Sequence, residues 1–201
     1  LIDASKVGGV SGMALRFTLK AWTRFQSTLE KYKKLIVLRP VSISNSSEVI
    51  QRLGVISVNV GLEVDVQGQV NSSHLMGSKI WTGIAGSYDF SRSGALSIFA
   101  VPSTAKRGKI SSIVPLVSHV DHTEHEVDII VTEQGVADLR GLDPWEKAQR
   151  IIEECAHPDY RDPLRDYLRK VKKESGHIPF SLEEAFSFYK RLREKGSMKE
   201  E

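Results

Sequence analysis

Three histidines lie at intervals of three residues near the middle of the chain: His119, His122 and His125, with Asp121 and Glu124 between them. Imidazole nitrogens and carboxylate oxygens are zinc ligands, so this spacing could supply a metal site. Helical spacing would place the imidazoles nearly on one face, whereas a strand would divide them between two faces. Zinc sites also tend to take a ligand from elsewhere, and the sequence shows no second cluster. We therefore expect a polar connector that binds no metal.

A glutamate soon after the histidines is a stronger candidate for chemistry. Glu133 follows the apolar run VDIIVT, which reads as a buried strand, and precedes Gln134 and Gly135. Open α/β sheets place their ligands outside the carboxyl ends of the strands, which is where this carboxylate would lie. The alternative is a structural glutamate that caps a helix or pairs with Arg140.

Two further segments could contact a ligand. The stretch WTGIAGS is neither a Walker loop nor a Rossmann fingerprint, but Gly83 and Gly86 would let the backbone approach a ligand closely. A tight turn between a strand and a helix explains the same glycines equally well. The stretch STAKRGKISS places Lys106, Arg107 and Lys109 in a turn, which suits phosphate but is equally common in exposed hairpins.

The elements that would position these groups follow from hydrophobic spacing. Strands are expected at 34–40, 96–103, 111–117 and 127–133, with a hairpin or two adjacent strands at 55–71 and a loop leading into a short helix at 77–95. Helices are expected at 18–33, 46–53, 144–156, 157–176 and 181–196, followed by a frayed tail at 196–201. The third and fifth of these helices begin with capping patterns: Asp143 before Pro144, and Ser181 with Glu184. Strands first and helices last predict an α/β or α+β domain, with a mixed sheet covered by helices.

Composition narrows the class of protein. The length of 201 residues suits one large domain, and the net charge of +3 without a basic block does not indicate nucleic acid. No apolar run approaches the ~20 residues that cross a bilayer, and from the opening residues we expect no signal peptide. The single cysteine, Cys155, excludes an internal disulfide and fits the cytoplasm. Because LIDASKVGG reads like the end of an amphipathic helix, we expect a fragment that lacks its natural N-terminal part.

Six segments in order carry a family resemblance: IVLRP, EVIQRLG, NVGLEVDVQGQVNSSH, GIAGSYDFSRSGALSIF, STAKRGKISSIVPLVSHVDHTEH and VDIIVTEQGVADLRGL. They resemble the C-terminal domain of the acetyl-CoA hydrolase/transferase family over residues 34–164. The SHVDHTEH segment is similar to the succinyl-CoA:acetate CoA-transferase branch. The resemblance implies a NagB/RpiA/CoA-transferase-like α/β fold over 1–195, an N-terminal domain as partner, and a homodimer.

The resemblance also implies a covalent mechanism with acyl-CoA and small carboxylates as substrates and no permanently bound cofactor. A glutamate attacks the acyl-CoA thioester, and a glutamyl-CoA thioester then forms. Backbone N–H groups stabilise the tetrahedral oxyanions. The family's positions fall on Gly86 for the oxyanion hole, Leu62, Thr82 and Lys106 for CoA contacts, and Asn45 and Glu133 for the other catalytic groups. Ala85 and Thr82 replace a glycine and an asparagine of the family motif.

The family's nucleophilic glutamate has no counterpart in this chain, since its motif would precede the LID segment at residues 1–3. Glu30 and Glu48 lie well inside later elements and do not match. We expect the C-terminal half of a CoA-transferase of the acetate/succinate type, inactive alone. The alternatives are an acetyl-CoA hydrolase of the same family, or a non-catalytic CoA-binding or assembly domain.

Overall fold

The computed structural model describes residues 8–200, which form two compact units. The first unit ends at Leu53 and the second begins at Gly54. The domain boundaries that the sequence suggests, 1–195 with a tail at 196–201, stay a prediction.

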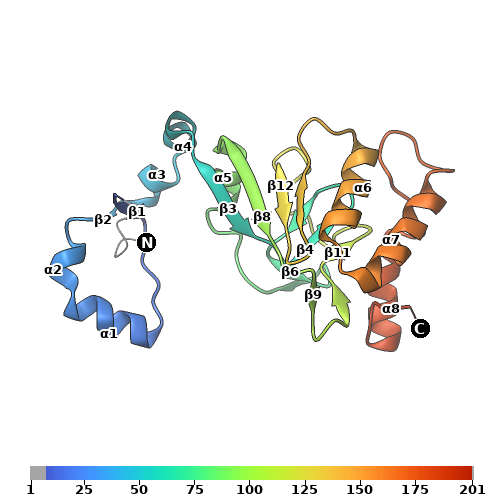
Figure 1. The fold of residues 1–201 in the computed structure, drawn as a ribbon, viewed down its shortest axis with the longest axis horizontal. Coiled ribbons are helices and arrows are strands. Elements are labelled where there is room, and N and C mark those ends of the chain that lie inside the picture. Colours follow the sequence, from blue (N-terminus) through green and yellow to red (C-terminus); the bar gives the residue numbers. More distant parts are fainter. Residues whose placement is uncertain (1–7, 201) are drawn as a thin grey trace. The chain divides into compact units, whose positions relative to one another are not determined.

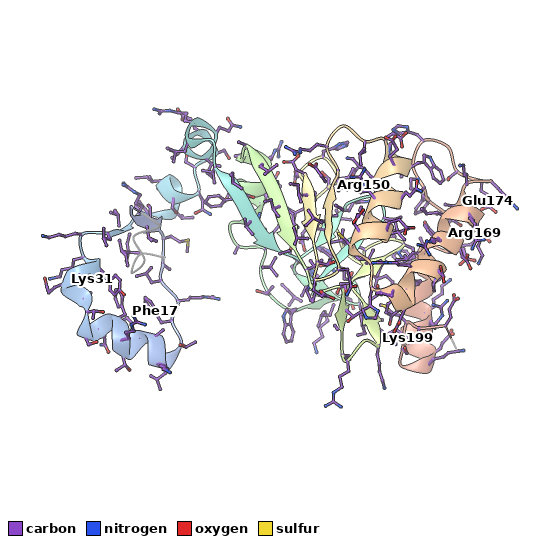
Figure 2. All side chains as sticks on the ribbon, viewed as in Figure 1. Phe17, Lys31, Arg150, Arg169, Glu174 and Lys199 are labelled. Atoms are coloured by element: carbon purple, nitrogen blue, oxygen red, sulfur yellow. The ribbon has the colours of Figure 1, made fainter. Side chains whose placement is uncertain are left out.

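The first unit joins two short parallel strands through two helices. Its elements are β1 Val10–Gly12, α1 Leu19–Ser27, α2 Leu29–Tyr32, β2 Ile36–Leu38, α3 Val41–Ser44 and α4 Ser47–Leu53. The Thr18 hydroxyl accepts a hydrogen bond from the Ala21 N–H at 3.3 Å, which caps the start of α1. The helix expected at 18–33 is present, but it divides at Thr28. Phe17, which precedes α1 and is labelled in Figure 2, stacks on Phe25 with ring centroids 4.8 Å apart.

The second unit is built on a four-stranded mixed sheet (Figure 1). Its strands are β3 Ile56–Val60, β8 Leu96–Ala100, β12 Ile129–Val131 and β13 Val136–Asp138. They lie in the order β13–β12–β8–β3, with β3, β8 and β12 parallel and β13 antiparallel. The strands expected at 96–103 and 127–133 are therefore confirmed. The short edge strand β13 was not predicted, because three residues carry too little periodicity.

A second sheet and two hairpins complete the strands. The three-stranded sheet has the order β11–β4–β5, with β4 Glu63–Asp65, β5 Val70–Asn71 and β11 Ile113–Val114. The hairpins are β6 His74–Leu75 with β7 Lys79–Ile80, and β9 Thr104–Ala105 with β10 Ile110–Ser111. The hairpin expected within 55–71 is β4–β5, and Gly68 turns it with a φ of +94°.

Four helices belong to the second unit: α5 Ser87–Ser93, α6 Pro144–Cys155, α7 Pro158–Val171 and α8 Ser187–Lys195. The start of α6 is as predicted, with Asp143 and Glu146 forming a capping box. The predicted start of the last helix at Ser181 is wrong. Only turns follow Ser181, and the Ser187 N–H bonds the Glu184 carbonyl at 3.0 Å before α8 begins. The mixture of helices and sheets is the predicted α/β class.

The residues after α8 are packed, which corrects the expectation of a frayed tail. Met198 is 1% exposed, and its N–H donates to the Lys109 carbonyl at 2.8 Å. The Lys199 ammonium, labelled in Figure 2, lies 2.5 Å from the Asp159 carboxylate. Burial of the apolar Met198 side chain stabilises the packed arrangement of this segment. The high charge of the segment, taken alone, suggests a frayed tail.

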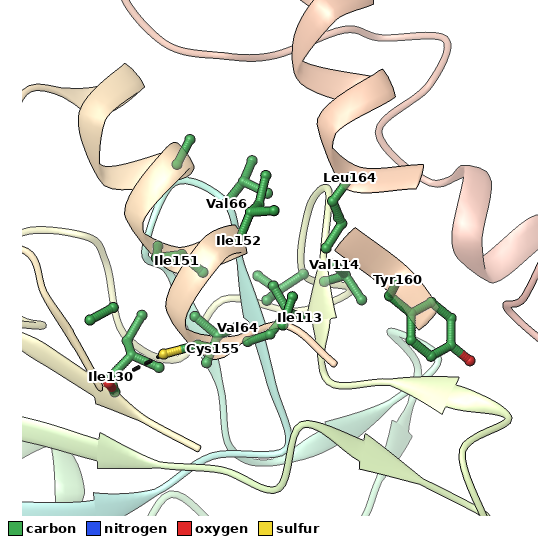
Figure 3. Close-up of a cluster of buried hydrophobic side chains, with 14 of the residues drawn as sticks. Val64, Val66, Ile113, Val114, Ile130, Ile151, Ile152, Cys155, Tyr160 and Leu164 are labelled. Atoms are coloured by element: carbon green, nitrogen blue, oxygen red, sulfur yellow. Dashed lines mark hydrogen bonds between the residues drawn. The ribbon is translucent and has the colours of Figure 1, made fainter. Parts of the chain in front are cut away.

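The main core of the second unit lies between α6, α7 and the two sheets (Figure 3). Ile151 and Ile152 of α6 meet Val64 and Val114 of the second sheet, and all four are at most 1% exposed. The Cys155 thiol donates to the Ile130 carbonyl at 3.5 Å, and burial raises its pKa to about 11. The thiol is therefore a packing group that stays protonated at neutral pH.

The two faces of the four-stranded sheet differ in burial. Phe99 and Ile130 point into the core and are fully buried, whereas Val58 and Val60, on the alternate face, are 67% and 71% exposed. Parallel strands are generally covered on both faces, so this exposed apolar face is suited to a further contact. No helix within residues 8–200 has the length and apolar composition needed to cross a membrane.

Candidate active site

The carboxyl ends of three parallel strands define the candidate site. Val60, Ala100 and Val131 are register partners at the ends of β3, β8 and β12. Glu133 follows β12 by two residues and therefore lies at this edge. The Gly86 end of α5 lies there too, because the chain after α5 returns to the opposite edge, where the Ala95 N–H bonds the Val55 carbonyl at 2.8 Å.

An open hollow of about 530 Å³ occupies part of this edge. Leu62, Thr82, Gly83 and Gly86 all line it, so the structure brings Leu62 together with the stretch WTGIAGS. The rest of its lining comes from β3, from the loop and start of α5, and from Ser72. Glu133 and Lys106 do not line it; Glu133 follows the end of β12 instead.

The glycine loop has an unusual backbone at the residue before Gly86. Ala85 has a φ of +51°, in the left-handed region where a Cβ costs roughly 1–2 kcal/mol. The Ser87 hydroxyl donates to the Ile84 carbonyl at 2.7 Å and closes the loop onto α5. Among residues 8–200, no hydrogen-bond acceptor takes the Gly86 N–H. That N–H is therefore a donor that a bound ligand could use.

Ser103 holds the carboxylate of Glu133. The Ser103 N–H donates to Glu133 Oε2 at 2.9 Å, and the Ser103 hydroxyl donates to Oε1. Burial by itself raises the pKa of Glu133, but the hydrogen bonds from Ser103 outweigh it and lower the pKa to about 2. Glu133 is therefore ionised at neutral pH. The alternative pairing with Arg140 is wrong, because Arg140 bonds Asp138 at 2.6 Å.

Lys106 does not line the hollow, and Asn45 belongs to the first unit. Lys106 is exposed at the tip of the β9–β10 hairpin, with a φ of +47°, three residues after Ser103. Asn45 caps the end of α3 in the first unit, and its Oδ1 accepts a hydrogen bond from the Ser44 hydroxyl at 2.8 Å. Because the family resemblance assigns Asn45, Gly86 and Glu133 to one active site, we expect them to converge on one cleft, and this stays a prediction.

The three histidines do not share an environment. His125 is exposed and His119 is half-buried, whereas His122 is fully buried. The expectation of a polar connector is therefore wrong for His122. Its backbone pairs with Val70 in a short antiparallel bridge, which carries the side chain beneath α5, and its ring packs against Phe99 at 4.7 Å.

A different histidine joins His119. His74, from β6, lies with its ring centroid 3.8 Å from that of His119, and these two residues with Asp121 form a group whose ligand atoms lie within 4.8 Å of one another. Sequence reasoning missed His74, which lies 45 residues before His119. The hydroxyl of Ser73 contacts His74 Nδ1 at 2.7 Å and donates to Asp121 Oδ2 at 2.6 Å. Hydrogen bonds thus already satisfy much of this group.

We predict that the purified protein holds no stoichiometric metal at His74, His119 and Asp121. The reason is that Ser73 already bonds the imidazole of His74 and the carboxylate of Asp121, so an ion would have to displace these hydrogen bonds. Metal analysis after gel filtration checks this. One equivalent of zinc, lost together with stability on chelation and restored by zinc, would contradict it.

Ser103 and Ser73 are site residues that sequence reasoning did not single out. The only sequence signal for Ser103 is its place just after an apolar strand, where a polar side chain reaches the sheet edge.

A larger hollow of about 810 Å³ lies elsewhere, and Glu174 and Glu183 in its lining make it unsuited to an anionic ligand. The sheet edge is therefore the better candidate site.

Comparison with known proteins identifies the family of this chain. Residues 22–168 match the family model described as the acetyl-CoA hydrolase/transferase C-terminal domain. The chain is 52% identical over 200 residues to a succinyl-CoA:acetate CoA-transferase of Clostridium kluyveri, covering 99% of this chain and 37% of that protein. It is 48% identical over 198 residues to a propanoyl-CoA:succinate CoA transferase of Escherichia coli, covering 98% and 40%.

A solved structure is similar as well. A 4-hydroxybutyrate CoA-transferase from Porphyromonas gingivalis matches with a TM-score of 0.55 and 34% identity, covering 70% of this chain and 34% of that one. The chain thus spans about two fifths or less of the length of the relatives that it matches. The family match and the identities lead to one conclusion: this chain belongs to the acetyl-CoA hydrolase/transferase family, as its C-terminal domain.

Proposed function

We propose that this chain supplies the CoA-binding and oxyanion-stabilising half of a CoA-transferase active site. One observation carries the proposal: the Gly86 N–H has no partner among residues 8–200 and lines the same hollow as Leu62 and Thr82. The ionised Glu133 lies at the same sheet edge. A backbone donor and an anion at the same sheet edge suit a reaction in which negative charge develops on a carbonyl oxygen.

The proposed reaction exchanges CoA between two carboxylates through a glutamate that this chain does not contain. That glutamate attacks the acyl-CoA carbonyl and expels CoA thiolate, which leaves an acyl-glutamyl anhydride. The thiolate attacks the glutamyl carbonyl, releases the first carboxylate and forms a glutamyl-CoA thioester. An incoming carboxylate reverses both steps. Gly86 stabilises each tetrahedral oxyanion, and Thr82 and Leu62 contact CoA.

Acetate and succinate are the proposed carboxylates, in line with the name of the Clostridium kluyveri relative. The alternative is an acetyl-CoA hydrolase reaction, which the family description also includes. In that case water, rather than a carboxylate, would open the glutamyl-CoA thioester. Acyl-CoA is a substrate in both cases, and the proposal includes no permanently bound cofactor.

The proposal includes two protein partners and a location. The exposed apolar face with Val58 and Val60 suits burial against another part of the longer gene product, for which we propose an N-terminal domain, and we propose a homodimer of the complete subunit. The cytoplasm is the proposed location, where the free thiol of Cys155 stays reduced.

The experiment uses the natural gene product that contains this chain. Purified protein with acetyl-CoA and succinate should form succinyl-CoA and acetate, and borohydride should trap a glutamyl thioester. A hydrolase would instead release free CoA without succinate. The 201-residue chain alone should bind CoA without turnover. Absence of exchange, hydrolysis and trapping in the natural gene product would overturn the enzymatic proposal and leave a binding or assembly role.

A further inference from the structure

The buried imidazole of His122 connects to the glycine loop. His122 is fully buried, and its Nε2 lies 3.1 Å from the Ser87 hydroxyl at the start of α5. The same hydroxyl lies 2.7 Å from the Ile84 carbonyl inside the loop. His122 therefore contacts the loop through one intervening side chain, at the end of the loop that carries Gly86.

The hydrogen bonds determine which nitrogen of His122 carries the proton. Burial lowers the pKa of His122, so its ring is neutral at pH 7. The single hydroxyl proton of Ser87 goes to the Ile84 carbonyl, so Nε2–H must donate to Ser87. The Ser91 hydroxyl shares its one proton between Nδ1 and the Tyr88 carbonyl, each 3.3 Å away, and Glu126 Oε2 lies 3.7 Å from Nδ1. Each ring nitrogen of His122 thus faces a serine hydroxyl of α5.

The residue before His122 acts on the other end of the loop. Asp121 Oδ2 accepts hydrogen bonds from the Ser72 N–H at 2.8 Å and the Ser73 hydroxyl at 2.6 Å. The Ser73 carbonyl in turn accepts from the N–H groups of Trp81 at 2.8 Å and Thr82 at 3.3 Å. Asp121 therefore fixes the short segment to which the beginning of the glycine loop is bonded.

We propose that Asp121 and His122 are positioning residues that clamp the loop 82–86 from its two ends. The proposal deepens the proposed function and rests on it for its kinetic consequences. Neither residue touches the hollow where CoA would bind. Their adjacency in sequence lets one short segment determine both where Thr82 lies and where the Gly86 N–H points. The histidine segment is thus a structural support for catalysis rather than a metal site.

The two ends of the clamp have different kinetic consequences. The His122–Ser87 end determines the direction of the Gly86 N–H, and removal of one oxyanion donor costs on the order of 10²–10³ in kcat. Partial misplacement should therefore lower kcat by at least about tenfold with KM nearly unchanged. The Asp121 end positions Thr82, which contacts CoA before and during reaction, so its loss should mainly raise KM for acyl-CoA.

Amide hydrogen exchange tests the clamp without reference to activity. In the natural gene product, Ser87→Ala should speed exchange of the amide at position 87, which donates to the Ile84 carbonyl in the wild type. Asp121→Asn should speed exchange of the amides of Trp81 and Thr82. Two controls match these variants: Ser91→Ala removes a bond to the same ring but none to the loop, and Asp128→Asn alters a carboxylate that accepts the Ser97 N–H.

Kinetics of the same variants complete the experiment. Ser87→Ala and His122→Gln should lower kcat, Asp121→Asn should raise KM, and both controls should stay within about twofold of the wild type. If the wild type does not exchange CoA between carboxylates, the proposed function fails. Amide hydrogen exchange then still tests whether Asp121 and His122 clamp the loop. Equal exchange rates at positions 81, 82 and 87 in variants and controls would overturn the clamp, even in an active enzyme.

Discussion

At pH 5, Asp65→Ala should destabilise the protein by on the order of 3–5 kcal/mol, because it leaves two buried N–H groups and one partly buried N–H group without an acceptor. Asp65 is fully buried, and its carboxyl oxygens accept from the N–H groups of Gln67, Gln69 and Val117 at 3.0, 2.9 and 3.2 Å. These bonds join the turn after β4 to the segment after β11. Urea unfolding followed by circular dichroism measures the loss.

The same carboxyl should make stability depend on pH. Burial raises the pKa of Asp65 from 3.8 to about 7, although the three N–H groups act against the rise. Between these values the folded state binds the proton and the unfolded state does not, so stability falls as pH rises from about 4 to 7. The fall is about 1.4 kcal/mol per pH unit at most, or up to roughly 4 kcal/mol in total.

Asp65→Asn isolates this effect, because all other titrating groups cancel when wild type and variant are compared at each pH. The free energy of unfolding of the wild type should fall relative to that of Asp65→Asn as pH rises from 5 to 7.5. Asp138→Asn is the control: Asp138 is half-buried, and its hydrogen bonds from Arg140 lower its pKa to about 2, below this window. A flat difference for Asp65→Asn, or a loss below about 1 kcal/mol for Asp65→Ala, would contradict the argument.

Local chemistry accounts for the elements that the sequence predicted well. The Asp143–Pro144–Glu146 start of α6 was predictable because all its hydrogen bonds lie within one turn. The similar pattern at Ser181 and Glu184 failed, since the chain there makes turns and becomes helical only at Ser187. A capping pattern reports that a helix could begin, and tertiary packing decides where it does.

Long-range pairing explains what the sequence could not predict. The strand-end rule predicted the edge at which Glu133 lies, because that rule needs only the order of strands. The burial of His122 depends on its pairing with Val70, 52 residues earlier, and on the position of α5. The packing of His74 against His119 likewise joins separate segments. Neither relation leaves a signal in local spacing or composition.

In the natural gene product, Glu133→Gln should lower kcat by about tenfold or more, which corresponds to ~1.4 kcal/mol or above in the activation barrier. Glutamine keeps the shape and can still accept from Ser103, but it removes the negative charge. In the proposed site that charge orients the nucleophilic glutamate and, by repulsion, makes its ionised form more reactive. Because hydrogen bonds hold the Glu133 pKa near 2, kcat between pH 5 and 8 should show no titration of Glu133.

Lys106→Ala should have the opposite kinetic signature. Lys106 is exposed on a hairpin tip, where its ammonium can pair with a CoA phosphate or carbonyl in the ground and transition states alike. Loss of such uniform binding raises KM for acyl-CoA and leaves kcat nearly unchanged. Lys109→Ala is the matched control, since Lys109 is an exposed lysine of the same turn that the family resemblance does not assign to CoA.

Steady-state kinetics with acyl-CoA varied at saturating carboxylate separate the two roles. A binding residue stabilises the ground state and the transition state equally, whereas a residue that alters the nucleophile changes the activation barrier between these two states. The assignment of roles would be reversed if Glu133→Gln changed only KM while Lys106→Ala changed only kcat. If Lys109→Ala raised KM as much as Lys106→Ala does, the turn would contribute only a diffuse positive potential, and the specific contact of Lys106 would be disproved.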